Sequence, residues 1–226
     1  MNIGVLGTGI VGQTIAARLA GLGHGVTVGT RDPEDTLART EPDMYGNPPF
    51  PVWREQHPDI GLGTFAEAAA SAEFLVNTTA GAASLEALTA AGDEHLEGMV
   101  LLDIANPLDF SQGMPPSLLV SNTDSLAEQI QRAFPDARVV KALNTMTAAV
   151  MVDPTQLAGG DHTVFVSGDD PGAKATVTEV LRSFGWTDIL DLGDITTARG
   201  VEMVLPIWIR LFGVLQNPIY NFKVVR

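Results

Sequence analysis

The feature that most constrains this chain is a set of three glycines at fixed spacing near its N-terminus. The run GTGIVG follows a short apolar segment, NIGVL, and leads into a segment with Ile15, Leu19 and Leu22 at helical spacing. A strand, a tight glycine turn and a helix in this order begin a βαβ unit that binds the phosphates of a dinucleotide. The first glycine permits the turn, the second lets pyrophosphate approach the backbone, and the third lets helix pack on strand. We therefore predict cofactor contacts at Gly7, Thr8, Gly9, Ile10, Val11 and Gly12.

The rest of the 226-residue chain alternates apolar runs with helix-period segments, which is typical of a parallel sheet covered by helices. The predicted strands are 2–6, 25–29, 73–78, 98–103, 137–142, 162–167 and 187–191. The predicted helices are 10–22, 33–39, 64–71, 82–92, 123–134, 171–184 and 194–215. The pattern indicates an α/β fold, a Rossmann-type, doubly wound, mainly parallel sheet with a small C-terminal helical extension. We predict a dinucleotide-binding Rossmann domain at 1–146. An extension of strands and helices at 147–226 would complete the substrate site and offer a possible dimer interface.

One segment, 40–60, departs from this alternation. It holds Pro42, Pro48, Pro49, Pro51 and Pro58, so we expect neither a regular helix nor a central strand there. Three aromatic residues in the segment either contact the adenine of the cofactor, contact a second subunit, or only hold the loop to the surface; they are Tyr45, Phe50 and Trp53.

Charge and composition exclude several classes of function. The formal net charge of −14, with basic residues scattered singly, argues against binding to nucleic acid or to an anionic membrane surface. The absence of cysteine excludes disulfides and thiolate chemistry. None of the four histidines has the spacing of a metal-ligand pair, so we predict no metal site. The N-terminus lacks the basic flank of a signal peptide, and the apolar segment 201–215 is too short to cross a bilayer, so we expect a cytoplasmic protein.

The residues that follow the second predicted strand indicate which dinucleotide binds. An NAD enzyme usually places an acid here, which accepts hydrogen bonds from the ribose hydroxyls and repels a 2′-phosphate. This chain has Thr30 and Arg31 instead, a hydroxyl and a permanent cation that suit a phosphate. Asp32 and Pro33 have the order of an N-cap and first helical residue, although Asp32 could instead turn inward and bind the ribose. We therefore predict NADP(H) in preference to NAD(H).

Uncharged polar residues follow three later strands, in the segments NTTAG, DIANPLD and KALNTM. The carboxyl ends of parallel strands meet at one edge, where ligands of open α/β sheets bind. We predict that these segments line the nicotinamide pocket through Thr78, Thr79, Ala80, Asn106, Asn144 and Thr145. Asp103 and Asp109 are interpreted as holding backbone groups of the loop. With no histidine in these segments, the pattern favours direct hydride transfer between two bound cofactors over chemistry that needs a catalytic residue of the protein.

The chain resembles the coenzyme F420-dependent NADP oxidoreductase family. The resemblance rests on GTGIVGQTIAARL, VGTRDPE, VVKALNT, VFVSGDD and the C-terminal LPIWIRLFGVLQNPIYNFKVVR, and covers nearly the whole chain. It implies hydride transfer between NADP(H) and a deazaflavin, coenzyme F420, in a homodimer. Thr8, Thr30 and Arg31 would hold the NADP phosphates. The residues implied around the deazaflavin are Asn144, Thr145, Met146, Leu205 and Ile207.

Two departures from the family pattern concern this second substrate. Members that use the deazaflavin can carry His at the position of Asn144, and commonly have Pro in the loop that reads NTTAG here. Two alternatives therefore stay open. One is an NADPH-dependent reductase of another small acceptor, a carbonyl, imine, flavin or quinone. The other is a non-enzymatic NADP(H)-binding sensor.

Overall fold

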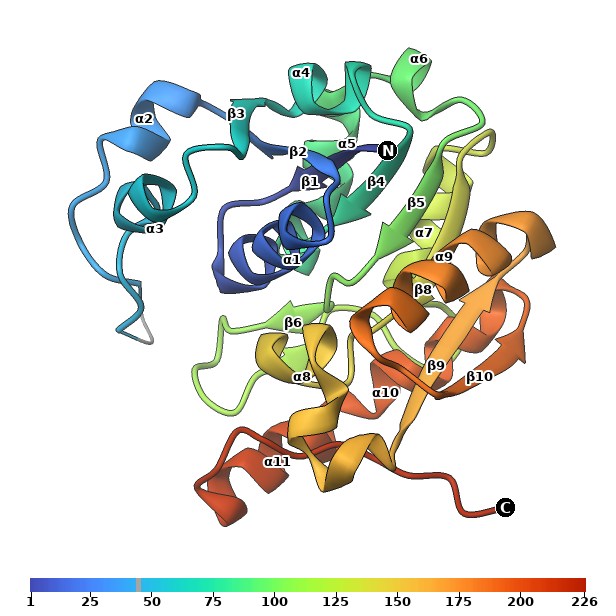
Figure 1. Cartoon of the computed structure of the whole chain (residues 1–226). Coiled ribbons are helices and arrows are strands. Elements are labelled where there is room, and N and C mark those ends of the chain that lie inside the picture. The colour runs from blue at the N-terminus through green and yellow to red at the C-terminus, as the bar shows by residue number, and fades with distance from the viewer. Residues whose placement is uncertain (44–45) are drawn as a thin grey trace.

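The computed structural model describes residues 1–43 and 46–226. Within these residues, eight strands form one sheet in the order β10-β9-β8-β5-β4-β1-β2-β3, with helices on both faces (Figure 1). The strands of the sheet are β1 (Asn2–Leu6), β2 (Gly25–Thr30), β3 (Gly61–Thr64), β4 (Phe74–Asn77), β5 (Val100–Asp103), β8 (Arg138–Ala142), β9 (Thr163–Gly168) and β10 (Asp188–Gly193). A separate hairpin pairs β6 (Leu108–Asp109) with β7 (Ser117–Leu118). This is the predicted Rossmann-type α/β fold.

Six neighbouring strands of the sheet are parallel, in the order β8-β5-β4-β1-β2-β3. From β1 the chain first adds β2 and β3 on one side and then β4, β5 and β8 on the other, so the strand order reverses at β1. Such a reversal point is where dinucleotides bind in doubly wound folds. The last two strands differ: β9 is antiparallel to β8, and β10 is parallel to β9. Consequently, β9 begins at the edge of the sheet where β8 ends.

Two hydrophobic cores fill the two faces of the sheet. The larger core holds Ile15 and Leu19 of α1 (Ile10–Gly21) together with Val177 of α9 (Pro171–Phe184). The other holds Leu88 of α5 (Ser84–Ala91) and Ile130 of α7 (Leu126–Ala133). Because both faces are covered, the central strands are mainly apolar, which explains the short apolar runs in the sequence.

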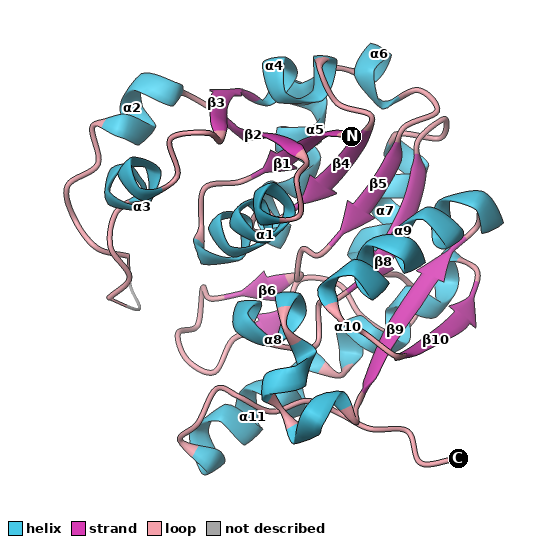
Figure 2. Cartoon of the chain, viewed as in Figure 1, coloured by secondary structure: helices cyan, strands magenta, loops and turns pink. Residues whose placement is uncertain are grey.

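Seven further helices and four 3-10 turns complete the described part of the structure. They are α2 (Pro33–Leu37), α3 (Phe50–Gln56), α4 (Phe65–Ala70), α6 (Asp93–Leu96), α8 (Ala148–Val152), α10 (Ala198–Met203) and α11 (Leu205–Leu215), with 3-10 turns at η1 (Gly81–Ala83), η2 (Pro154–Gln156), η3 (Ala158–Gly160) and η4 (Ile195–Thr197). Figure 2 shows β5 pointing toward the β6–β7 hairpin, with α8, α10 and α11 on the same side of the molecule. In the part of the chain that the structure describes, no helix combines the length and the hydropathy needed to cross a bilayer.

All seven predicted strands are present, but the prediction that 40–60 contains no regular helix was wrong. A helix, α3, forms there with Pro49 as its N-cap and Pro51 in its first turn, where a missing N–H breaks no helical bond. Phe50 is buried in the larger core, and Trp53 packs against that core; Tyr45 lies outside the described residues. A short strand, β3, then pairs with β2 at the edge of the sheet.

The predicted helix 194–215 is divided into η4, α10 and α11. Pro206 lies in the first turn of α11, where proline is tolerated, whereas it would interrupt one continuous helix.

Candidate functional site

The glycine loop lies where β1 passes into α1. Gly7 has a φ of 121°, a conformation that residues with a side chain rarely adopt. A Cβ at Gly12 would lie 2.2 Å from the Gly7 carbonyl oxygen and 2.8 Å from Thr78 Oγ1, so close packing of α1 requires glycine. At Gly9, no atom beyond the immediate neighbours lies within 4 Å of the position of a Cβ. This open position beside the N-terminal N–H groups of α1 fits a pyrophosphate.

Hydrogen bonds join the strand ends that the sequence predicts to be neighbours. The Gly7 N–H donates to the Gly29 carbonyl at 2.9 Å, and the Thr78 hydroxyl and N–H donate to the Leu6 carbonyl at 2.8 and 2.9 Å. The Asn106 amide donates to the Asn144 carbonyl at 3.1 Å. The loops after β1, β2, β4, β5 and β8 therefore lie together at one edge of the sheet.

At the β2 end of this edge, the hydroxyl of Thr30 is already engaged. Thr30 is 4% exposed, and its Oγ1 lies 2.8 Å from Oγ1 of Thr36 in α2. Arg31, by contrast, is exposed, and its Nη2 lies 2.9 Å from Oε1 of Glu86 in α5. Arg31 is thus the exposed group of the predicted pair, while the Thr30 hydroxyl faces α2.

The predicted start of α2 is confirmed. Asp32 is the N-cap, and its Oδ1 accepts hydrogen bonds from the N–H groups of Glu34 at 2.8 Å and Asp35 at 3.0 Å. The Asp32 carboxylate therefore caps the N-terminus of α2. A second cation, which sequence analysis missed, reaches the glycine loop: Arg39 Nη1 lies 3.0 Å from Thr8 Oγ1. In the sequence, Arg39 is one of many scattered basic residues, so only the fold identifies it.

The predicted nicotinamide residues form a hydrogen-bonded set. Thr79 donates from its hydroxyl to Asn77 Oδ1 at 2.7 Å, and Asn144 Nδ2 donates to Asn106 Oδ1 at 3.2 Å and to the Val201 carbonyl at 3.0 Å. Thr78, Thr79 and Asn106 are partly exposed, and Ala80 is exposed. These groups can hold a carboxamide or ribose hydroxyls.

Beneath this set lies a buried charged cluster that sequence analysis did not assign. Lys141 Nζ is 2.8 Å from Asp103 Oδ2 and 3.0 Å from Glu202 Oε1, and the three side chains are 0%, 0% and 1% exposed. Burial lowers the pKa of the Lys141 ammonium, but the two carboxylates outweigh it and raise the pKa above its ordinary value. A lysine inside the apolar strand RVVKA was a signal that carboxylates must lie nearby.

The two aspartates near the site hold backbone groups, as predicted. Asp103 Oδ1 accepts from the Ala105 N–H at 3.2 Å and from Asn77 Nδ2 at 2.8 Å, and Asp109 Oδ1 accepts from the Ser111 N–H at 2.8 Å. The Asp103 carboxylate also neutralises the charge of the buried Lys141 ammonium.

The residues implied around a second substrate are mostly covered. Asn144, Thr145, Met146 and Leu205 are 1% to 4% exposed, whereas Ile207 is 55% exposed. Of this group, only Ile207 has an exposed side chain.

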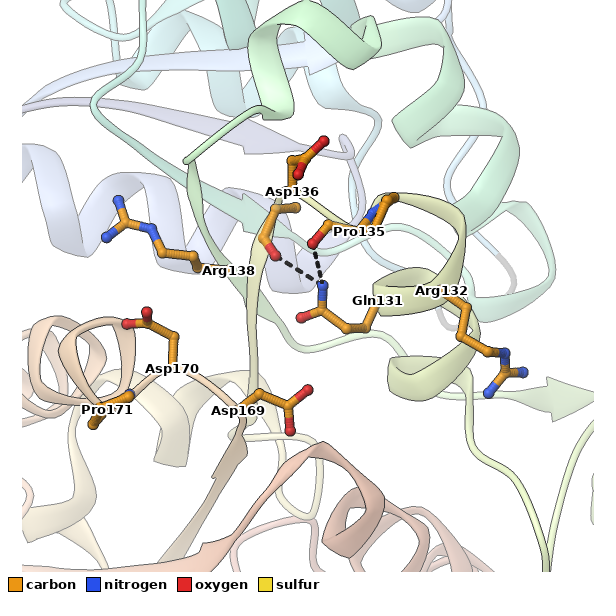
Figure 3. Close-up of a pocket in the computed structure, with 9 residues that line it drawn as sticks. Gln131, Arg132, Pro135, Asp136, Arg138, Asp169, Asp170 and Pro171 are labelled. Atoms are coloured by element: carbon orange, nitrogen blue, oxygen red, sulfur yellow. Dashed lines mark hydrogen bonds between the residues drawn. The ribbon is translucent and has the colours of Figure 1, made fainter.

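A separate cavity of about 910 Å³ lies at the opposite edge of the sheet, between α7, the start of β8 and the start of α9. Figure 3 shows its polar lining, which includes Arg138, Asp169 and Asp170. Arg138 donates to the Gly98 carbonyl, Asp169 accepts from the Ile195 N–H, and Asp170 caps α9. These groups hold the structure together, so the glycine-loop edge remains the candidate site.

Comparisons with known proteins agree with this assignment. The sequence profile described as NADP oxidoreductase, coenzyme F420-dependent, matches residues 2–107. The crystal structure of a candidate F420-dependent NADP-reductase from Arthrobacter sp. FB24 is 61% identical, covers 100% of both chains and superposes with a TM-score of 0.95. The chain belongs to the coenzyme F420-dependent NADP oxidoreductase family. Within this family it is an NADP-dependent oxidoreductase, as the sequence predicts.

Two curated relatives extend the comparison. F420-dependent NADP reductase of Methanothermobacter marburgensis is 28% identical over 215 residues, which are 93% of this chain and 92% of the relative. The metalloreductase STEAP3 of Rattus norvegicus is 30% identical over 212 residues, which are 92% of this chain. This chain spans only 38% of the length of STEAP3.

Proposed function

We propose that the protein transfers hydride reversibly between NADP(H) and a deazaflavin, coenzyme F420. The observation that carries this proposal is the match over the full length of both chains to a candidate F420-dependent NADP-reductase. A reductase of the same name from a methanogen also aligns along nearly its whole length. The polar, mainly uncharged nicotinamide edge is consistent with chemistry that resides in the two cofactors.

The residues present fit an NADP molecule. The open position at Gly9 and the N-terminus of α1 would receive the pyrophosphate, and exposed Arg31 would receive the 2′-phosphate. Asp32, which caps α2, offers no competing carboxylate to the ribose. Thr79 and Asn106 would orient the nicotinamide through hydrogen bonds.

When both are bound, the nicotinamide and the deazaflavin supply the hydride chemistry. The protein contributes orientation and the exclusion of water, which lower the barrier by placing the reacting carbons together. Ile207 would contact the acceptor directly, while Asn144, Thr145, Met146 and Leu205 would form the layer beneath it.

The test is to mix the purified protein with NADPH and oxidised F420 and to follow the visible absorbance of the deazaflavin. We expect the absorbance to bleach with one NADPH consumed per deazaflavin. An unchanged spectrum at millimolar NADPH would contradict the choice of acceptor.

The match to STEAP3 supports a second candidate, an NADPH-dependent reductase of a different acceptor, such as a flavin or a metal complex. Parallel assays with free flavin and with a ferric chelate separate it from the first. NADPH oxidation by one of these, without deazaflavin bleaching, would favour the second candidate.

We also propose that the protein is a homodimer through α11. Beyond Ile207, which is assigned to the acceptor, this helix exposes Phe212, Val214 and Leu215, at 47%, 78% and 50%. Burying such side chains against a second copy would remove apolar surface from water.

A further inference from the structure

We propose that Arg39 is a second specificity residue for the 2′-phosphate of NADP(H), and that Glu86 competes with this phosphate for Arg31. The inference rests on the proposed placement of the adenosine end of the cofactor at Arg31. It goes further in two ways. It assigns the guanidinium of Arg39 to the phosphate in place of the Thr30 hydroxyl, and it identifies Glu86 as a competitor of the phosphate for Arg31.

The first step is the position of Arg39. It follows α2, yet its Nη1 lies 3.0 Å from the hydroxyl of Thr8 in the glycine loop. Gly7 and Gly29 are joined by a backbone hydrogen bond of 2.9 Å, so Thr8 runs beside the end of β2, where Arg31 begins. Arg39 therefore reaches the glycine loop beside the end of β2, the strand that Arg31 follows, while Arg31 itself pairs with Glu86 in α5.

The second step is the state of Thr30. Its Oγ1 is buried and lies 2.8 Å from Oγ1 of Thr36, so the hydroxyl expected beside Arg31 already has a partner. A phosphate needs several donors, and a guanidinium supplies a fork of them with a permanent charge. Arg39 therefore supplies the additional hydrogen-bond donors that the Thr30 hydroxyl does not offer to the phosphate.

The third step concerns the partner of Arg31. Arg31 Nη2 and Glu86 Oε1 are 2.9 Å apart, and the side chains are 70% and 69% exposed. Such an exposed ion pair is weak, because water and salt screen it. A phosphate carrying nearly two negative charges would displace Glu86 from Arg31. Glu86 thus competes with the phosphate for Arg31 and slightly lowers the affinity for NADP(H).

The experiment measures the dissociation constants of NADPH, NADH and 2′,5′-ADP by calorimetry for the wild type and for Arg31→Ala, Arg39→Ala and Glu86→Gln. We expect Arg39→Ala to weaken NADPH and 2′,5′-ADP about tenfold and to leave NADH nearly unchanged. Glu86→Gln should tighten NADPH roughly two- to threefold at low salt. Arg182→Ala is the matched control, because Arg182 is an exposed, ion-paired arginine on α9.

The outcomes separate the two claims. Equal weakening of NADPH and NADH by Arg39→Ala would assign Arg39 to the pyrophosphate and overturn its role in specificity, as would no weakening at all. Unchanged NADPH affinity in Glu86→Gln would overturn the role of Glu86. A wild type with no preference for NADPH, or an Arg31→Ala variant that retains the preference, would instead contradict the proposed placement of the adenosine end.

Discussion

At the scale of single residues, Gly9 and Gly12 belong to one loop, but protein packing requires glycine only at position 12. Gly12 is required by the fold, because a Cβ there would overlap the Gly7 carbonyl oxygen. Gly9 has an ordinary φ of −74° and free space around it, so the fold would accept a side chain. Glycine at position 9 is therefore explained by the binding of a ligand and not by the packing of the protein.

This difference gives a paired prediction. Gly12→Ala should lower the free energy of unfolding by about 1–3 kcal/mol, because α1 must shift to relieve the overlap. Gly9→Ala should keep the wild-type stability but bind NADPH more weakly, because the methyl group occupies the approach of the pyrophosphate. Urea unfolding and NADPH titration of both variants check this. A Gly9→Ala variant with full NADPH affinity would contradict the placement of the pyrophosphate.

Residue-level predictions from sequence were reliable where the chemistry is local. The capping role of Asp32 depends only on its neighbours in the chain, and the structure confirms it. The partner of Thr30 depends on how α2 packs against β2, and the partner of Arg39 depends on a loop 31 residues away. Contacts of this second kind can be identified only once the fold is known.

At the scale of elements, the Lys141 cluster joins four of them. Lys141 lies in β8 and Asp103 in β5, and Glu202 in α10 accepts hydrogen bonds from the N–H groups of Leu126 at 2.8 Å and Ala127 at 3.1 Å at the start of α7. The neighbouring Val201 carbonyl accepts from Asn144. The cluster therefore fixes α10 against the proposed nicotinamide pocket.

We expect Lys141→Met to lower the free energy of unfolding by about 3–5 kcal/mol, because it leaves two buried carboxylates without their cation. Glu202→Gln should cost less, because the Lys141 and Asp103 charges still balance. Lys223→Met is the control, since its ion pair with Asp161 is on the surface and contributes about 0–1 kcal/mol. Urea unfolding at pH 7 measures all three; equal effects of Lys141→Met and Lys223→Met would refute the role of the buried cluster.

The pH dependence follows from the sign of the shift. The pKa of Lys141 is raised in the folded state, so its stabilisation is fully present below the ordinary lysine pKa of 10.5 and is lost as pH rises through the folded value. The difference between wild type and Lys141→Met should therefore stay constant through neutral pH and shrink only in strong alkali.

Element-level prediction succeeded for most of the periodic segments and missed several short elements. The helix α9 and the central strands follow from periodicity alone, because burial on one or both faces fixes their composition. The helix α3 does not follow from the proline content, because proline disfavours the interior of a helix but is tolerated at its N-cap and in its first turn. The β6–β7 hairpin and α8 have too few residues to show a period.

At the scale of the whole molecule, the exposed face of α11 leads to a prediction about assembly. The wild type should be a dimer in solution, and Phe212→Glu should shift it toward monomer, because a carboxylate would be buried at the interface. Light scattering coupled to gel filtration at micromolar concentration measures this. Leu22→Glu, at an exposed apolar position after α1, should leave the mass unchanged. A monomeric wild type would contradict the proposal.

The overall arrangement was predictable because alternating strands and helices admit few topologies, and the glycine loop fixes which edge of the sheet binds the cofactor. The acceptor side was less accessible to prediction. Its residues come from the loop after β8 and from α10 and α11, whose packing depends on Glu202 and Val201, far along the chain.

The reversed direction of β9 bears on how the molecule could be altered. Because β9 begins at the edge where β8 ends, the whole segment 143–162 stays on that edge, and α10 returns the chain to it. The proposed acceptor half would thus be assembled from two inserts, 143–162 and 198–215, that carry none of the residues assigned to the phosphates. Grafting both inserts from a relative, with Glu202 kept as the partner of Lys141, should transfer that relative's choice of hydride acceptor while this chain keeps its preference for NADP(H).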